Sequence, residues 1–404
     1  MTAERGPTPP SERIVGLDAL RGFALLGILV INVRLFAMPE VVLLNPTAYG
    51  EFTGANYWAW FAGHVLVEQK FMTLFTVLFG GGVVLFTRNA ERRDDSALAL
   101  QFRRARWLIV FGLAHAYLLW YGDILVAYGV TALGVVYLRD QTPRTLTLLG
   151  VALLLVPSAT EVLWALTGDL SEFARTWRPP QAALQAEIET YRSGWLEQLD
   201  HRVPTVFDRQ TSGYLASTVW RVGGTMLFGM ALFKWGVLTN ERSTRFYRRL
   251  VVVGATTGLA AVLAGVWYIE AAGWTSSAAL FWLQFNYWGS LPLAGAYVGL
   301  VMLYARWRPE GVLTRTLAAV GRTAFSNYLL QTVLATSIFY GHGLGLFGRV
   351  TRVEALGVVA AIWAVQVVLS IVWLRYFRYG PMEWLWRVLT YNELQPLRRG
   401  HREG

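Results

Sequence analysis

The sequence predicts an all-α, polytopic membrane protein with about ten transmembrane helices. Of its 404 residues, 54% are hydrophobic and only 15% are charged, whereas soluble domains carry about 25% charged residues. Apolar stretches of about 20 residues recur along the chain, and a helix of that length crosses a bilayer. The basic residues cluster between these stretches, as the positive-inside rule describes. The net charge of +10 therefore indicates membrane topology, and we expect no nucleic-acid partner.

The expected spans follow one another with alternating direction, and the chain falls into three parts. Residues 1–12 are a polar, Pro-rich cytoplasmic tail that we expect to be disordered, and they lack the features of a signal peptide. Residues 13–378 form a single transmembrane bundle, and residues 379–404 form a cytoplasmic C-terminal tail. The expected spans are 13–38, 68–87, 104–121, 123–138, 145–166, 213–238, 251–271, 281–304, 317–340 and 354–374.

The connecting segments fix the orientation of these spans. Residues 39–57 hold acids and no Lys or Arg, so we place them outside, followed by an interfacial helix at 57–67. The basic segment 88–106 belongs in the cytoplasm. Only Gly122 separates the third and fourth spans, which predicts a tight hairpin at the outer face. Residues 167–212 form the longest outer loop, with an amphipathic helix expected around 181–199.

The first span carries more polar residues than a membrane anchor needs. Arg21 and Asn32 are 11 residues apart, close to a whole number of helical turns, so they share one face. Asp18 lies one turn below Arg21. Polar residues inside a span usually face a bundle interior or an aqueous cavity. Arg34, near the outer end, is expected to extend to the interface.

Sorting the polar residues by depth gives two sets. The inner set is Asp18, Arg21 and Arg322, and the outer set is Asn32, Glu68, Lys70 and Asp123. His115 lies between them, and Asn327 and Gln331 lie above Arg322 on the ninth span. This arrangement is typical of a conduit that binds an anionic compound from the cytoplasm. The absence of Cys and the scattering of the five His predict no metal site.

Each of these residues also has a purely structural interpretation. Asp18 and Arg21 form an ion pair at a helix end, His115 is satisfied by a backbone carbonyl, and Asp123 caps the fourth span. Glu68 and Lys70 pair with each other at the membrane surface, and His64 is solvated. These interpretations stay open at this point, but they do not explain polar residues at matched depths on different helices.

Six segments resemble the YeiB-like bacterial membrane proteins. They are LDALRGFALLGILVIN, LNPTAYG, KFMTLFTVLFGGG, GLAHAYLLWYGDILVAYG, GRTAFSNYLLQT and YGPMEWLWRVLTY. That family is in turn distantly similar to transmembrane acyltransferases, namely the acyltransferase-three proteins and heparan-α-glucosaminide N-acetyltransferase. The resemblance implies a multi-pass protein of a prokaryotic cytoplasmic membrane, and the basic connecting segments place both termini inside. It also implies acyl-CoA as donor and an envelope glycan or lipid-linked molecule as acceptor.

The resemblance assigns roles to individual residues. Acyltransferase-three proteins carry an Arg, ten residues and a catalytic His in the first helix; here Arg21 matches the Arg, but Asn32 occupies the His position. Because Asn cannot act as a base, we expect His115 to be the base, oriented by Asp123, with His64 as second choice.

The remaining roles follow from the two sets of polar residues. Arg21 and Arg322, beside Asp18, would bind the CoA phosphates. Asn32 and Lys70 would stabilise the oxyanion. The remaining substrate-binding residues would be Glu68, Asn327 and Gln331.

Two other functions fit the same residues. Intramembrane His, Asp and Arg also serve transporters of small anions or metabolites, although the sequence shows no inverted repeat of the kind found in many transporters. A catalytically inactive relative is the other alternative, because Asn32 replaces the catalytic His. The sequence leaves the acyl chain, the acceptor and homo-oligomer formation open.

Overall fold

The computed structural model of the chain describes residues 14–93 and 95–399. Over these residues the chain is helical and contains no strand, apart from one isolated bridge between Phe377 and Arg398. The predicted all-α class is therefore confirmed. The tail expected at residues 1–12 lies outside the described residues.

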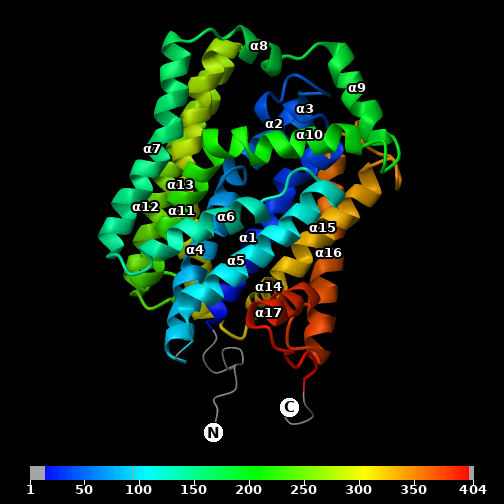
Figure 1. Cartoon of the computed structure of the whole chain (residues 1–404). Helices are drawn as coiled ribbons and strands as arrows, with labels where there is room; N and C mark the ends of the chain where they lie inside the picture. Colours follow the sequence, from blue (N-terminus) through cyan, green and yellow to red (C-terminus); the bar gives the residue numbers. More distant parts are fainter. Residues whose placement is uncertain (1–13, 94, 400–404) are drawn as a thin grey trace.

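The bundle consists of long helices that run between two ends of the molecule (Figure 1). They are α1 (Val15–Ala37), α4 (Lys70–Glu91), α5 (Ala97–Ala114), α6 (Leu125–Val135), α7 (Pro143–Thr167), α11 (Val219–Lys234), α12 (Thr244–Ala271), α13 (Ser276–Trp307), α14 (Val312–Arg322), α15 (Ala324–Phe339) and α16 (Arg352–Tyr376). Short irregular turns are η2 (His115–Leu119), η3 (Val136–Leu138) and η4 (Tyr214–Thr218).

Shorter helices cover the ends of the bundle. One end carries α2 (Val41–Leu44), α3 (Gly54–Leu66), α8 (Ser171–Trp177), α9 (Gln181–Arg192) and α10 (Leu199–Gln210). The opposite end carries α17 (Pro381–Tyr391), and both the first turn of α1 and the described segment that follows α17 lie on that side (Figure 1). We call these the loop end and the terminal end.

Six stretches of the described chain are long and apolar enough to cross a membrane, judged by length and composition. They are α1, the stretch 54–91 that joins α3 and α4, α7, α12, α13 and α16. The chain therefore has the helices of a membrane protein, but the expected number of ten spans is not confirmed.

Two expected helices differ from those in the structure, and a third is found with slightly shifted bounds. The single helix expected at 317–340 is broken at Thr323 into α14 and α15, because Glu383 of α17 accepts hydrogen bonds from the backbone N–H groups of Phe325 and Ser326 and so caps the second helix (2.6 and 3.2 Å). The helix expected at 181–199 ends at Arg192, and α10 follows. The interfacial helix expected at 57–67 corresponds to α3.

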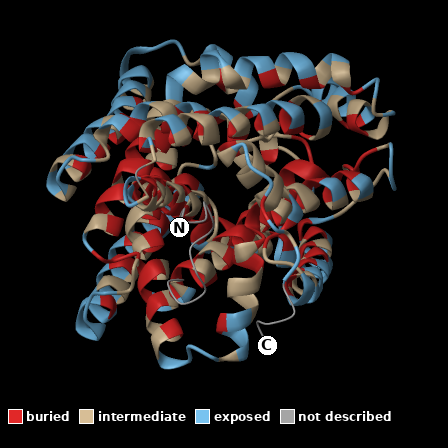
Figure 2. Ribbon diagram, turned by 60° about the horizontal axis from the view of Figure 1, so that its bottom comes forward, coloured by how far each residue is buried: buried red, intermediate tan, exposed pale blue. Residues whose placement is uncertain are grey.

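Burial separates a central helix from peripheral ones. In the most apolar part of α1, 67% of the residues are buried, compared with 28% in α7, α12 and α16. The peripheral helices expose large apolar residues such as Leu148, Val252 and Val368, and Figure 2 shows exposed residues along the outer helices. Such apolar surfaces are typical of contact with lipid.

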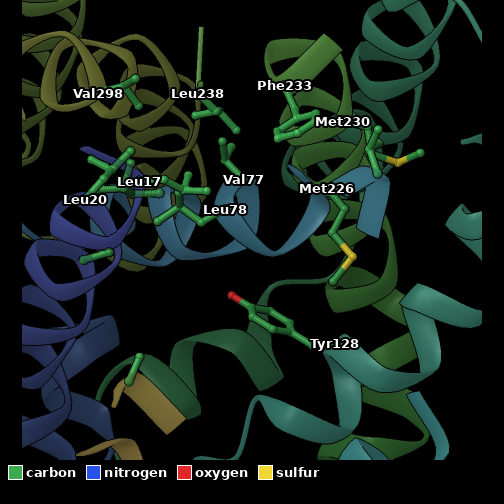
Figure 3. Packing of buried hydrophobic residues seen from close by; sticks show 14 of the residues in the cluster. Leu17, Leu20, Val77, Leu78, Tyr128, Met226, Met230, Phe233, Leu238 and Val298 are labelled. Atoms are coloured by element: carbon green, nitrogen blue, oxygen red, sulfur yellow. The ribbon is translucent and has the colours of Figure 1, made fainter. Parts of the chain in front are cut away.

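The core packs α4 between α1 and α11. Figure 3 shows Val77 and Leu78 of α4 among Leu17 of α1 and Met226 and Phe233 of α11. All five side chains are buried. This contact fixes three helices around one internal space.

Candidate functional site

A cavity of about 1490 Å³ extends through the bundle. Its lining combines residues from the terminal end and residues from the loop end. At the terminal end it is lined by six arginines, which we call the arginine cluster: Arg21, Arg93, Arg104, Arg322, Arg378 and Arg387. Toward the loop end its charged and amide residues include Asn32, Glu40, Glu68, Asp123, Glu161, Arg209 and Arg221.

The close crossing of α1 and α14 brings Arg21 and Arg322 to the same wall. A Cβ on Gly22 would lie 2.0 Å from the Leu317 carbonyl oxygen, and a Cβ on Gly321 would lie 1.9 Å from that of Asp18. Only glycine permits this approach at both positions. The two arginines are the direct sequence neighbours of these glycines, so the backbone contact sets the spacing of their side chains.

Asp18 and Arg21 form the ion pair that the sequence indicated. The Arg21 Nη1 donates to Asp18 Oδ1 over 2.9 Å, and both residues line the cavity. The structural interpretation of this pair is thus satisfied, and the pair also belongs to the cavity wall. Asp18 holds Arg21 in place beside Arg322.

Arg104 and α17 complete the arginine cluster. The Arg104 guanidinium lies over the Trp386 ring at 4.6 Å and over the Phe86 ring at 4.9 Å. The Trp386 indole N–H donates to the Arg104 carbonyl over 2.9 Å. Arg93, Arg104, Arg378 and Arg387 were not among the site residues expected from the sequence. The signal that was available is the amphipathic pattern of α17, which has aromatic residues on the face that lines the cavity.

His115 and Asp123 are joined across the hairpin between η2 and α6. His115 Nδ1 lies 2.9 Å from Asp123 Oδ1, and His115 Nε2 lies 2.9 Å from the Thr332 hydroxyl. Asp123 Oδ2 also accepts from the Val126 backbone N–H over 2.8 Å, so Asp123 caps α6 as well. Asp123 lines the cavity, whereas His115 stands behind it with both ring nitrogens occupied. The expected pairing is present. Asp123 is the member of the pair that belongs to the cavity lining, and its side chain is 1% exposed.

Glu68 is the centre of a second buried group. Its carboxylate lies 3.5 Å from Arg34 Nη1 and 3.3 Å from His64 Nδ1, and it accepts from the Asn286 amide over 3.4 Å. Glu68 lines the cavity. The Arg34 side chain is buried and also donates to the Trp60 carbonyl over 3.2 Å. The expectation that Arg34 extends to the interface is therefore wrong, because Glu68 holds it inside.

Lys70 and His64 are buried behind Glu68 and do not line the cavity. Lys70 Nζ donates to the His64 carbonyl over 2.6 Å and to the Asn286 amide oxygen. It does not form the surface pair with Glu68 that the sequence allowed. The His64 ring stacks between Trp60 and Trp282, with centroids 5.2 Å from each. The expectation of a solvated His64 is wrong.

Asn327 and Gln331 bind neighbouring helices instead of the cavity. The Asn327 amide donates to the Ser370 hydroxyl over 2.8 Å, and the Gln331 amide donates to Gln366 over 3.0 Å. Both residues are buried between α15 and α16 and are not part of the cavity lining. The structure gives them a packing role in place of the expected substrate contact. Asn32, in contrast, lines the cavity, and its amide has no hydrogen-bond partner among the described residues.

The loop end of the cavity carries a small acidic group. Glu40 pairs with Arg209 of α10, and both line the cavity. The Glu40 backbone N–H donates to the Glu187 carboxylate over 2.9 Å. Burial raises the pKa of Glu187 from 4.5 to about 7. Among the described residues, no group of three or more His, Cys, Asp or Glu is placed to hold a metal ion.

Comparison with known proteins identifies the family. The chain is 36% identical to the uncharacterized protein YeiB of Escherichia coli over 394 residues, which cover 95% of this chain and 98% of the relative. The chain belongs to the YeiB-like family. It is also 33% identical to the uncharacterized protein YxaH of Bacillus subtilis, over 97% of each chain.

A family model supports the same assignment. Residues 232–393 of this YeiB-like chain match the family described as "Protein of unknown function (DUF418)". The predicted resemblance to YeiB-like proteins is thus confirmed. The more distant similarity to acyltransferases is not part of these findings and stays a prediction.

Proposed function

We propose that this YeiB-like protein is an acyl-CoA-dependent transmembrane acyltransferase. The observation that carries the proposal is the single cavity, which is lined at one end by the arginine cluster and toward the other by Asn32, Glu68 and Asp123. An acyl donor entering at the terminal end and an acceptor entering at the loop end would meet inside this space. The acceptor would be an envelope glycan or a lipid-linked molecule.

The orientation of the protein is part of the proposal. The arginine cluster and both termini would face the cytoplasm, and α8, α9 and α10 would lie outside. The excess of basic residues at the terminal end supports this orientation. Because the relatives are bacterial, the membrane would be the cytoplasmic membrane of a prokaryote.

The arginine cluster would bind the phosphate groups of acyl-CoA. Arg guanidinium groups bind phosphates through paired hydrogen bonds, and acyl-CoA is available only on the cytoplasmic side. Arg21 and Arg322, held by the glycine crossing, would be the central contacts. Arg104 would contribute charge from the opposite wall.

Asp123 would accept the proton of the acceptor in the transfer step. The acceptor oxygen or nitrogen attacks the thioester carbonyl, its proton passes to Asp123, the carbon–sulfur bond breaks, and CoA leaves as the thiol after taking up that proton. His115, hydrogen-bonded to Asp123, would orient the carboxylate and share the proton. The unpartnered Asn32 amide would stabilise the oxyanion. Lys70 has no part in this step because it does not reach the cavity.

The experiment is transfer of labelled acyl groups in proteoliposomes that contain the protein and a membrane extract as acceptor source. Asp123→Asn should lower the transfer rate at least about 100-fold, the usual contribution of a general base. Asp140→Asn, which changes an exposed carboxylate in the turn after η3, is the matched control and should leave the rate unchanged. Full activity of Asp123→Asn would remove this residue as base, and no transfer from any acyl-CoA would count against the reaction class.

Transport of a small anion is the second candidate function. It is favoured by the same cavity, because residues from both ends of the bundle line one space. Substrate-dependent flux in liposomes without consumption of acyl-CoA would support transport over acyl transfer. An inactive relative would show neither activity.

A further inference from the structure

Arg221 of α11 is a charged residue in the cavity wall that the proposed acyl transfer does not use. Its Nη2 donates to the Ser290 hydroxyl over 2.8 Å and to the Thr73 hydroxyl over 3.3 Å, and its Nη1 donates to the Tyr287 carbonyl over 3.2 Å. All three acceptors are neutral. In the described part of the chain, no carboxylate forms an ion pair with this guanidinium.

The other cavity-facing charges near Arg221 do not neutralise it by contact. Glu161 lines the same cavity, but its carboxylate accepts a hydrogen bond from the Gln284 amide over 2.7 Å. Glu68 is paired with Arg34. A charge inside a membrane bundle is costly unless it is paired or serves a ligand. The guanidinium therefore retains the capacity to bind an anion from the cavity.

Arg221 is too far from the arginine cluster to serve the same anionic group. Thr73, which contacts Arg221, and Phe86, which contacts Arg104, are 13 residues apart on α4. At 1.5 Å per residue this corresponds to about 20 Å. A phosphate group bound at one position cannot contact the other. The cavity thus has two cationic sites, one near each end.

We propose that Arg221 is the anion-binding residue of a second ligand site, which takes a molecule carrying a phosphate or carboxylate group. Thr73, Ser217 and Thr218 also line the cavity. The Thr73 hydroxyl accepts from Arg221 and keeps its own proton for a hydrogen bond to a ligand. The inference rests on the proposed function in one respect: the molecule bound here is the acyl acceptor, which is therefore anionic. Its anionic group belongs either to a lipid headgroup or to a free soluble compound.

The chain contains no Cys, so a single introduced Cys can report on the site. Thr218→Cys places a thiol three residues before Arg221 on the cavity wall. We expect a sulfonate-carrying thiosulfonate reagent to label the purified protein roughly tenfold faster than a trimethylammonium-carrying one, as a cationic cleft concentrates anions. Arg221→Gln should abolish this preference and Arg221→Lys should keep it. Asn89→Cys, near the arginine cluster, is the matched control, and its preference should not change with Arg221→Gln.

Protection from labelling then tests binding and identifies the source of the anion. The probes are inorganic phosphate, short-chain phosphatidic acid and, as neutral control, short-chain diacylglycerol. If only phosphatidic acid protects the thiol, the anion belongs to a lipid headgroup. If inorganic phosphate also protects it, the ligand is a soluble anion. Either result supports the site, provided that Arg221→Gln removes the protection. No protection by either phosphate probe, or equal protection in Arg221→Gln, would overturn the inference. Because acyl transfer is not measured, a failure here is separate from a failure of the proposed reaction.

Discussion

The crossing of α1 and α14 should be intolerant of even one added methyl group. In Gly321→Ala the new Cβ would start 1.9 Å from the Asp18 carbonyl oxygen, and in Gly22→Ala it would start 2.0 Å from that of Leu317. Ordinary contact begins at 3.4 Å, so the helices must part by about 1.5 Å for Gly321→Ala and by about 1.4 Å for Gly22→Ala. Overpacking of this kind costs about 1–3 kcal/mol. Because Arg21 and Arg322 adjoin the two glycines, donor binding at the arginine cluster should weaken as well.

Heat unfolding in detergent micelles, followed by the fluorescence of the 18 Trp, measures this effect. Gly82→Ala is the matched control: it lies on α4, and a Cβ there would meet nothing within 4 Å. The control should gain up to about 1 kcal/mol, because Ala favours the helix over Gly. The double variant Gly22→Ala/Gly321→Ala should lose less than the sum of the single losses, since one separation of the helices relieves both clashes. A Gly321→Ala protein as heat-stable as the unmodified chain would refute the reasoning.

Three further predictions concern charged residues. Arg34→Met should destabilise the protein by about 3–5 kcal/mol in denaturation experiments, because it leaves the Glu68 charge buried without its cation. The double variant Arg34→Met/Glu68→Gln should regain part of this loss. Arg21→Gln should change stability by less than about 1 kcal/mol, because the pair with Asp18 is partly exposed, while it raises the KM for acyl-CoA in the transfer assay. Glu187 binds its proton more tightly in the folded protein, so stability should fall as pH rises from about 4.5 to about 7. Glu187→Gln should remove this slope and add up to about 3 kcal/mol at pH 8 in unfolding measured across pH.

Local spacing was the part of the site that the sequence could predict. Asp18 and Arg21 are three residues apart on one helix, so their pairing follows from helix geometry. Gly122 leaves so short a connection that His115 and Asp123 have to lie near each other. The helices themselves follow from apolar length and basic connections.

Residues whose partners lie far along the chain could not be placed in this way. Arg34 is buried because Glu68, 34 residues later, reaches it. Gln331 turns away from the cavity because Gln366 on α16 accepts its hydrogen bond. Helical periodicity gives the relative faces of residues on one helix, but it does not say which face meets which neighbour. The place of α17 in the cavity wall could not be predicted either, because it depends on a distant contact: Glu383 of α17 caps α15.

The proposed acyl transfer needs a proton acceptor other than Asn32, and two histidine–carboxylate pairs offer candidates. In both pairs the acidic residue belongs to the cavity lining and the histidine does not: Asp123 pairs with His115, and Glu68 pairs with His64. Glu68 contacts the Arg34 guanidinium in addition to His64. Among the described residues, no Lys or Arg forms an ion pair with Asp123, so we propose Asp123 rather than Glu68 as the proton acceptor. Asp123→Asn removes that acceptor, whereas His115→Gln leaves the carboxylate in place, so transfer should fall further in the first variant than in the second.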